Sequence, residues 1–188
     1  MENTLIDMQL VNDTRLTEKE ALNLYDQLDP VDIPFMLGRW KGAGVRTNHP
    51  MDGLLEATGW YGKLFISENN VHPLLFKGRG NTLFSINPHF IPMGLLYLNL
   101  PKHSALKYLV HLSRPFYQTK KSTARLRMVE FRGKVSAAMC YDNKPINDCF
   151  RRLDENRVLA IMDFKLKNQP YIFILERDNS MMKVAIKE

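Results

Sequence analysis

Acidic and basic side chains stand on otherwise apolar faces of predicted strands in the last third of the chain. Arg127 and Glu130 lie in one such strand, and Asp148, Asp163 and Glu176 lie in three later ones. A charge among apolar side chains is costly unless another group pairs with it. Two interpretations are open. The charges form structural pairs or reach water at strand ends, or they form a polar patch inside a ligand cavity.

The cavity interpretation gives each charged residue a task. Arg127 would hold an anionic head group through its paired N–H donors, and Glu130, Asp148 or Asp163 would orient that group. An apolar pocket with one buried arginine suits a fatty acid or a similar amphiphile. The expected lining residues are aromatic or apolar: Trp40, Trp60 or Tyr61, and Met139.

An enzyme acting on such a ligand is the second hypothesis. A barrel that holds an acid and a base in its lumen can catalyse proton transfer. His49 and Glu130 are the candidate acid/base residues, and no residue is assigned as catalytic. The sequence contains neither a Gly-x-Ser-x-Gly nucleophile elbow nor a phosphate-binding P-loop.

Metal binding is not expected, because the sequence lacks His-x-x-x-His and Cys-x-x-Cys motifs. The histidines are spread along the chain, at positions 49, 72, 89, 103 and 111. A turn centred on residues 143 and 144 places Cys140 opposite residue 147 and Cys149 opposite residue 138. The two thiols then sit diagonally, and we expect them to stay free.

The heptapeptide Gly38–Gly44 is expected to form the first strand of a small closed β-barrel. Its three glycines leave room for bulky groups to cross close to the backbone. Trp40, between them, supplies an apolar plug that seals one end of the barrel.

Helices are expected before and after this strand. Thr17 and Glu20 form a capping box that opens a helix over 17–28, which ends before Pro30. Shorter helices are expected at about 54–57 and within 105–112.

The last third of the chain predicts an antiparallel meander. The turns between the expected strands are only a few residues long, and connections of that length join antiparallel neighbours. The expected strands are 124–132, 134–141, 145–153, 157–164 and 171–178.

The apolar segment from Phe90 to Phe116 is interrupted by prolines. Three interpretations are open: a long packed connection, a lid over a cavity, or a surface for association with another copy or another protein.

The charge balance permits an anionic partner without demanding one. The net charge is +6 and the sequence pI about 9.3. The bases are scattered and form no Arg-Gly or aromatic–basic repeat, so a nucleic-acid partner is not expected. No apolar run reaches the roughly 18–20 residues that span a bilayer. The N-terminus has acids where a signal peptide has bases, and we expect a cytoplasmic location.

Several motifs resemble the bacterial GXWXG family. They are Gly38-x-Trp40-x-Gly42, His49-Pro50-x-Asp52-Gly53-Leu54-Leu55 and Gly59-Trp60-Tyr61-Gly62-Lys63. The stretch from Arg125 to Gly133 and the motif Tyr141-Asp142-x-x-Pro145-Ile146-x-Asp148 are similar to the uncharacterised domain that usually accompanies this family. The family has no established activity, so the resemblance implies membership of the family but no mechanism.

The alternation Gly38-x-Trp40-x-Gly42-x-Gly44 is also similar to the opening strand of nitrobindin-type barrels, which are relatives of the lipocalins and fatty-acid-binding proteins. This resemblance implies a barrel that holds haem or apolar molecules. The nitrobindin haem ligand is a histidine near the C-terminus, whereas no histidine follows His111 here. Haem is therefore disfavoured, and no cofactor is assigned.

These observations predict a mainly β, calycin- or lipocalin-like barrel with an N-terminal helix and short mid-chain helices. Residues 1–16 are an N-terminal segment, and residues 17–188 are one domain with a GXWXG part over 17–66 and the meander over 120–178. The expected function is binding of a small apolar or amphipathic molecule. The alternatives are an enzyme acting on that molecule and a partner-binding module that uses residues 90–116.

Overall fold

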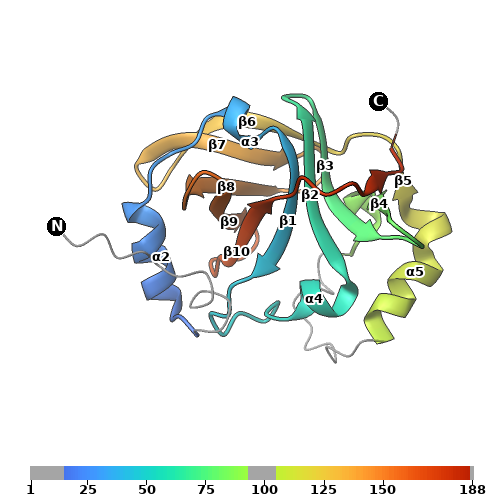
Figure 1. Ribbon diagram of the computed structural model, residues 1–188. Helices are drawn as coiled ribbons and strands as arrows, with labels where there is room; N and C mark the ends of the chain where they lie inside the picture. The colour runs from blue at the N-terminus through green and yellow to red at the C-terminus, as the bar shows by residue number, and fades with distance from the viewer. Residues whose placement is uncertain (1–14, 93–104, 187–188) are drawn as a thin grey trace.

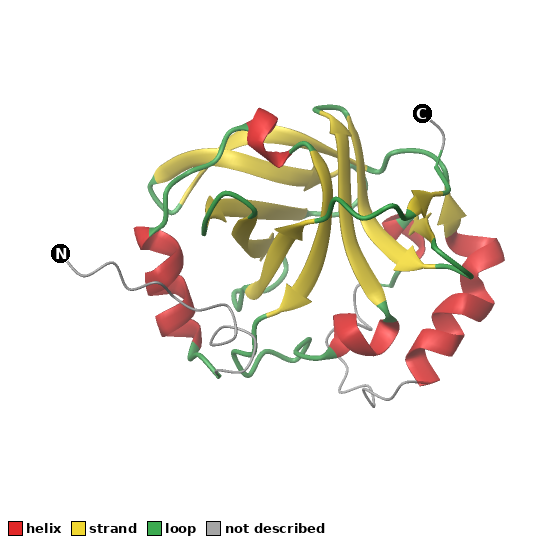
Figure 2. Ribbon diagram, viewed as in Figure 1, coloured by secondary structure: helices red, strands yellow, loops and turns green. Residues whose placement is uncertain are grey.

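The computed structural model describes residues 15–92 and 105–186. They form one β-barrel, largely antiparallel, with helices outside it and at its ends (Figures 1 and 2). The strands are β1 Gly38–Gly44, β2 Trp60–Ser67, β3 Asn70–Lys77, β4 Thr82–Ile86, β5 Gln118–Thr119, β6 Ala124–Phe131, β7 Lys134–Tyr141, β8 Ile146–Arg152, β9 Arg157–Phe164, β10 Tyr171–Arg177 and β11 Lys183–Val184. The helices are α2 Glu18–Gln27, α3 Ile33–Met36, α4 Leu54–Thr58 and α5 Ala105–Tyr117, with a 3₁₀ turn at Pro88–Phe90.

The barrel closes where β3 meets β6. The strand order β3-β2-β1-β10-β9-β8-β7-β6 is completed by the pair Val71 and Ala124, so the described strands include a ring of eight. The amide of Leu126 also donates to the carbonyl of Glu68 across this seam, at 2.7 Å. A ring of eight strands encloses an interior that side chains can fill or that can hold one small ligand.

The predicted meander is confirmed as β6 to β10. Each strand begins and ends within a residue or two of its expected bounds, because the turn residues between the strands are unambiguous. Ala138 pairs with Cys149 and Cys140 with Asn147, as the turn arithmetic requires, and both thiols are free.

Helix α2 covers the outside of the meander. Thr17 and Glu20 form the expected capping box, in which the Thr17 hydroxyl accepts from the Glu20 amide at 3.2 Å. Ala21 and Tyr25 are buried against outward-facing residues of β7 to β10, among them Leu159 and Ile172. The amphipathic stripe of α2 therefore adds a second apolar layer to the barrel wall.

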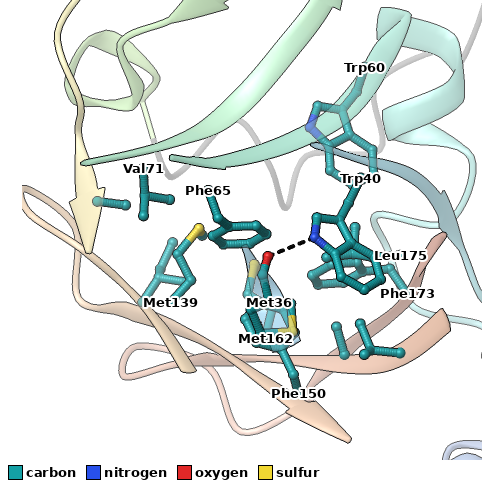
Figure 3. Packing of buried hydrophobic residues seen from close by; sticks show 14 of the residues in the cluster. Met36, Trp40, Trp60, Phe65, Val71, Met139, Phe150, Met162, Phe173 and Leu175 are labelled. Atoms are coloured by element: carbon teal, nitrogen blue, oxygen red, sulfur yellow. Dashed lines mark hydrogen bonds between the residues drawn. The ribbon is translucent and has the colours of Figure 1, made fainter. Parts of the chain in front are cut away.

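One end of the barrel is packed solid. Helix α3 lies at this end, and Trp40 Nε1 donates to the Met36 carbonyl at 2.7 Å (Figure 3). Trp40 is completely buried, with Phe65, Met139 and Phe150 in the same core cluster. The indole therefore serves as the plug that the glycine–tryptophan strand predicts.

The glycines of β1 make room for side chains of neighbouring strands. A Cβ at Gly42 would lie 2.1 Å from the Trp60 ring, and one at Gly44 would lie 2.3 Å from the Tyr171 hydroxyl. At Gly62, φ is +153° and a Cβ would meet the Trp40 carbonyl at 1.9 Å, so only glycine fits there.

Candidate functional site

The other end of the barrel holds a cavity of about 620 Å³. Strand β1 begins beside α3 and ends beside α4, where the Gly44 amide donates to Glu56 at 2.9 Å. The cavity thus lies between the plugged half of the barrel and the α4 end. Its lining comes from α4, α5 and strands on both sides of β1, and includes Leu54, Trp60, Leu74, Met162 and Phe173. Its volume is typical of sites for small molecules, which occupy about 300–1,000 Å³.

A buried ion pair stands in the wall of this cavity. Lys63 Nζ lies 2.7 Å from Asp148 Oδ2, and the two side chains are only 3% and 2% exposed. Burial raises the pKa of Asp148, and the ammonium of Lys63 opposes that rise. Two charges of opposite sign are therefore held in a largely apolar enclosure.

Aromatic rings surround the Lys63 ammonium. Nζ lies 5.5 Å from the ring centroid of Trp60, 5.7 Å from that of Tyr141 and 5.2 Å from that of Phe173. All three rings line the cavity. The negative faces of aromatic rings stabilise a desolvated cation, which explains how a lysine is tolerated at this depth.

A β-bulge places Lys63 inside the barrel. Trp60 and Lys63 both line the cavity, although residues three apart on a regular strand face opposite sides. The register between β2 and β3 shifts between Trp60 and Gly62, where two steps along β2 oppose one step along β3, so β2 carries one extra residue there. Lys63 is therefore the residue of the site that alternation alone does not predict.

Three buried polar atoms in the cavity-lining side chains have no hydrogen-bond partner among the described residues. They are Trp60 Nε1, Tyr171 Oη and Asp148 Oδ1. Burial also raises the pKa values of Tyr141 and Tyr171 well above the ordinary range, so both phenols stay protonated. The enclosure thus combines an apolar lining with a few polar atoms that can still form hydrogen bonds.

The cavity reaches the surface beside α5. Leu109, Leu112 and Phe116 belong to its lining, yet they are 59%, 76% and 80% exposed. Near the same mouth, Lys144 Nζ donates to the carbonyls of His89 and Ile91, at 3.1 and 2.9 Å. These bonds tie the β7–β8 turn to the segment that leaves β4.

Two family models match the chain. Residues 23–80 match the family described as GXWXG protein, and residues 122–177 match a domain of unknown function, DUF4334. The chain belongs to the GXWXG family. The first match covers β1 to β3 and the second covers β6 to β10, so both contribute strands to the ring. Lys63 comes from the first match and Asp148 from the second, and the buried ion pair joins the two.

This GXWXG protein is similar to a protein from Thermomonospora curvata whose crystal structure has been solved. The two share 32% sequence identity with a TM-score of 0.65, over 88% of this chain and 90% of that one. No curated protein matches the chain.

The residues that sequence reasoning placed in a pocket separate into three groups in the GXWXG protein. Trp60 and Asp148 line the cavity. Trp40 and Met139 lie in the packed core and are not part of the cavity lining. Tyr61 faces the outside of the barrel, where its hydroxyl donates to Asp178 at 2.5 Å.

Neither Arg127 nor Glu130 lines the cavity, contrary to the expected pocket contacts. Strand β6 turns Ala124 and Leu126 inward. The Arg127 guanidinium instead bonds Glu68 at 3.2 Å and Asn69 at 2.9 Å, and Glu130 is exposed. Asp163 and Glu176 are exposed on the outer face as well. Lysine in a bulge, not arginine on β6, supplies the buried cation.

His49 is buried in the loop that follows β1, outside the cavity lining. Its Nδ1 accepts from the Met51 amide at 3.1 Å, and its ring packs on Tyr171 with centroids 5.3 Å apart. Within residues 15–92 and 105–186, no group of three or more His, Cys, Asp or Glu is arranged to hold a metal ion. None of the helices described has the length and apolarity to cross a membrane.

Proposed function

We propose that this GXWXG protein binds a small amphipathic molecule inside the barrel, with an uncharged polar group beside Lys63 and Asp148. The observation that carries the proposal is a 620 Å³ cavity, largely apolar, with a charged pair in its wall and a mouth at α5. Such enclosures, in which a few polar groups converge, are the usual form of small-molecule sites.

The ion pair favours a neutral head group over an anion. The charges of Lys63 and Asp148 cancel, so a carboxylate would add an uncompensated negative charge to a buried site. A hydroxyl or carbonyl adds no net charge. It can accept from the Lys63 ammonium, and a hydroxyl can also donate to the unpartnered Asp148 Oδ1. An alcohol or ketone with an apolar tail is therefore the favoured ligand class.

The direction of the ligand follows from where the polar groups lie. Lys63 and Asp148 are nearly inaccessible, whereas the cavity-lining leucines of α5 are exposed. The polar group of the ligand would enter first, and its apolar tail would lie along Leu74 and Phe76 toward α5. Burial of that tail supplies most of the binding free energy, at about 25 cal/mol per Å².

Displacement of the neutral dye Nile red by compounds of one chain length tests this proposal. We expect 1-decanol to displace the dye about tenfold more effectively than n-decane or decanoate, since one buried hydrogen bond to a charged group contributes about 1.5 kcal/mol. The variant Lys63→Met/Asp148→Leu should still bind n-decane but lose the preference for 1-decanol.

Matched size variants separate cavity binding from surface adsorption. Leu74→Trp replaces an aliphatic side chain of the cavity lining with a bulky indole and should abolish binding of 1-decanol. Ile66→Trp makes a similar change at a partly exposed position on β2 and should leave binding unchanged. Equal binding by the wild type and Leu74→Trp, or a preference for decanoate, would contradict the proposal.

Acid–base catalysis on a carbonyl ligand is the second candidate function. It is favoured by the convergence of two titratable groups, Lys63 and Asp148, at 2.7 Å within the cavity. If it operates, the protein should accelerate exchange of the α-hydrogens of 2-decanone for deuterium, as followed by proton NMR in D₂O. Asp148→Asn should remove the acceleration. Binding of 2-decanone without exchange would leave the protein a carrier.

A further inference from the structure

Helix α5 turns an apolar face toward solvent. Tyr108, Leu112 and Phe116 are spaced four residues apart, so they lie on one side of the helix, and Tyr108 is 74% exposed like its two neighbours. Leu109 widens the same face, and no residue of α5 is buried. A surface helix ordinarily turns its apolar stripe toward the core.

The other side of α5 contacts the barrel, through Leu106 and Val110 and through polar residues. The Arg114 guanidinium lies 4.3 Å from the ring centroid of Phe84 on β4, and the His111 ring lies 5.8 Å from it. The Lys107 stem lies against Gly59, where an added Cβ would be 3.2 Å from its Cγ. These contacts fix the rotation of α5 about its axis and leave Tyr108, Leu112 and Phe116 outward.

The net positive charge of the chain comes from the sequence segment that contains this helix. Residues 69–129 contain nine Lys and Arg and no Asp or Glu. The remainder of the chain contains 17 Lys and Arg and 20 Asp and Glu, a net charge of −3, so the whole excess of +6 comes from the segment that includes α5. Lys107, Lys120 and Lys121 are exposed within it.

We propose that the exposed face of α5, formed by Tyr108, Leu109, Leu112 and Phe116, docks on an anionic lipid bilayer surface. The apolar side chains would enter the boundary between headgroups and acyl chains, and the surrounding lysines would lie among lipid phosphates. Apolar and cationic groups together match both layers of such a surface. The docking is independent of the cavity's ligand, although Leu112 and Phe116 also line its mouth.

Charge and apolar surface together favour an anionic membrane over two other partners, a second copy of the chain and a nucleic acid. In a second copy of the chain, residues 69–129 also carry nine Lys and Arg and no Asp or Glu. Repulsion between the two positively charged segments opposes self-association through α5. A nucleic acid would neutralise the lysines but would offer no hydrocarbon to Leu109 and Leu112. An anionic membrane satisfies the charge and the apolar face at once.

Co-sedimentation with vesicles tests the proposal on the full-length protein. Vesicles of phosphatidylcholine with about 30 mol% phosphatidylglycerol should bind the protein at about 0.1 M salt, and binding should weaken about tenfold with phosphatidylcholine alone or at about 0.5 M salt. Leu112→Gln/Phe116→Gln should weaken binding to the mixed vesicles at least about tenfold.

Met128→Gln/Val135→Gln is the matched control, because these apolar residues are about half exposed on β6 and β7. It should bind vesicles as the wild type does. Nile red displacement by 1-decanol, measured in parallel without vesicles, reports the cavity separately. Three results would each overturn the proposal. They are equal vesicle binding by the α5 variant and the control, no vesicle binding by the wild type, and a wild-type dimer that dissociates in Leu112→Gln/Phe116→Gln.

Discussion

Lys63 and Asp148 give this barrel an interior that differs from a simple hydrocarbon core. Two opposite charges are buried together at 2.7 Å, and aromatic rings and apolar side chains occupy much of the space around them. A buried pair contributes little net stability compared with apolar residues of similar size, whereas removal of one partner is severely destabilising. A contribution to net stability therefore does not by itself explain the pair.

The first prediction at this scale concerns the single substitution Lys63→Met. It leaves Asp148 buried without its cation, so the free energy of unfolding should fall by about 3–5 kcal/mol at pH 7, as measured by urea denaturation. Burial already raises the pKa of Asp148 above that of the unfolded chain. The deficit should therefore shrink as the pH falls toward the unfolded value of 3.8, and it should disappear below about pH 3, where the carboxyl is protonated in both states.

The double variant Lys63→Met/Asp148→Leu is the control for that prediction. It removes both charges and should recover most of the stability that Lys63→Met loses. A single variant as stable as the wild type at pH 7 would show that Asp148 does not depend on Lys63.

A second prediction at the residue scale concerns Gly42, which lies under the Trp60 ring. Gly42→Ala places a Cβ 2.1 Å from the ring and should lower the free energy of unfolding by about 1–3 kcal/mol. Trp60→Leu should relieve the clash, so that Gly42→Ala becomes much less destabilising in that background. Additive effects in this double-mutant cycle, followed by thermal unfolding, would contradict the packing of Trp60 over β1.

At the scale of the elements, the carboxylate of Asp178 holds the segment after β10 in place. Asp178 accepts from Arg39 Nε at 2.6 Å, from the Tyr61 hydroxyl and from the Ser180 amide, and Arg39 also donates to the Met182 carbonyl. Burial raises the pKa of Asp178, but these hydrogen bonds outweigh it and lower the pKa to about 2. They fasten the chain that leads to β11 across β1 and β2.

A third prediction follows from that lowered pKa. The unfolded value is 3.8, so Asp178 stabilises the fold fully above about pH 4 and loses this contribution as the pH falls toward 2. Asp178→Asn should lower the free energy of unfolding by about 2 kcal/mol at pH 7, and the difference should narrow below about pH 4. Asp163→Asn, at an exposed position on β9, should change it by less than about 0.5 kcal/mol.

At the scale of the whole molecule, the sequence predicts the barrel better than the site. Strands β6 to β10 follow from turn residues and alternation, and Trp40 follows from its glycines. The inward position of Lys63 could not be derived, because the bulge at Gly62 breaks the alternation that would place it outside. Asp148, a lone acid on an apolar face, was the available signal that an unidentified cation had to lie near it. Arg127, the residue expected to hold an anionic head group, is turned outward by β6 and bonds Glu68.

Closure of the ring brings the two matched segments into one barrel. The GXWXG part supplies Lys63 and the DUF4334 part supplies Asp148, so neither alone contains the pair. Side chains of α3 and the adjoining strands fill one half of the interior, and the other half is hollow. The central claim is that this hollow half holds a small amphipathic molecule.

Native mass spectrometry of the protein purified from cells tests that claim most directly. The wild type should carry a noncovalent adduct of a small molecule that dissociates at raised collision energy. Leu74→Trp, which narrows the cavity, should carry none, and Ile66→Trp should carry the wild-type adduct. The same bare mass for all three proteins, unchanged after incubation with 1-decanol, would contradict the account.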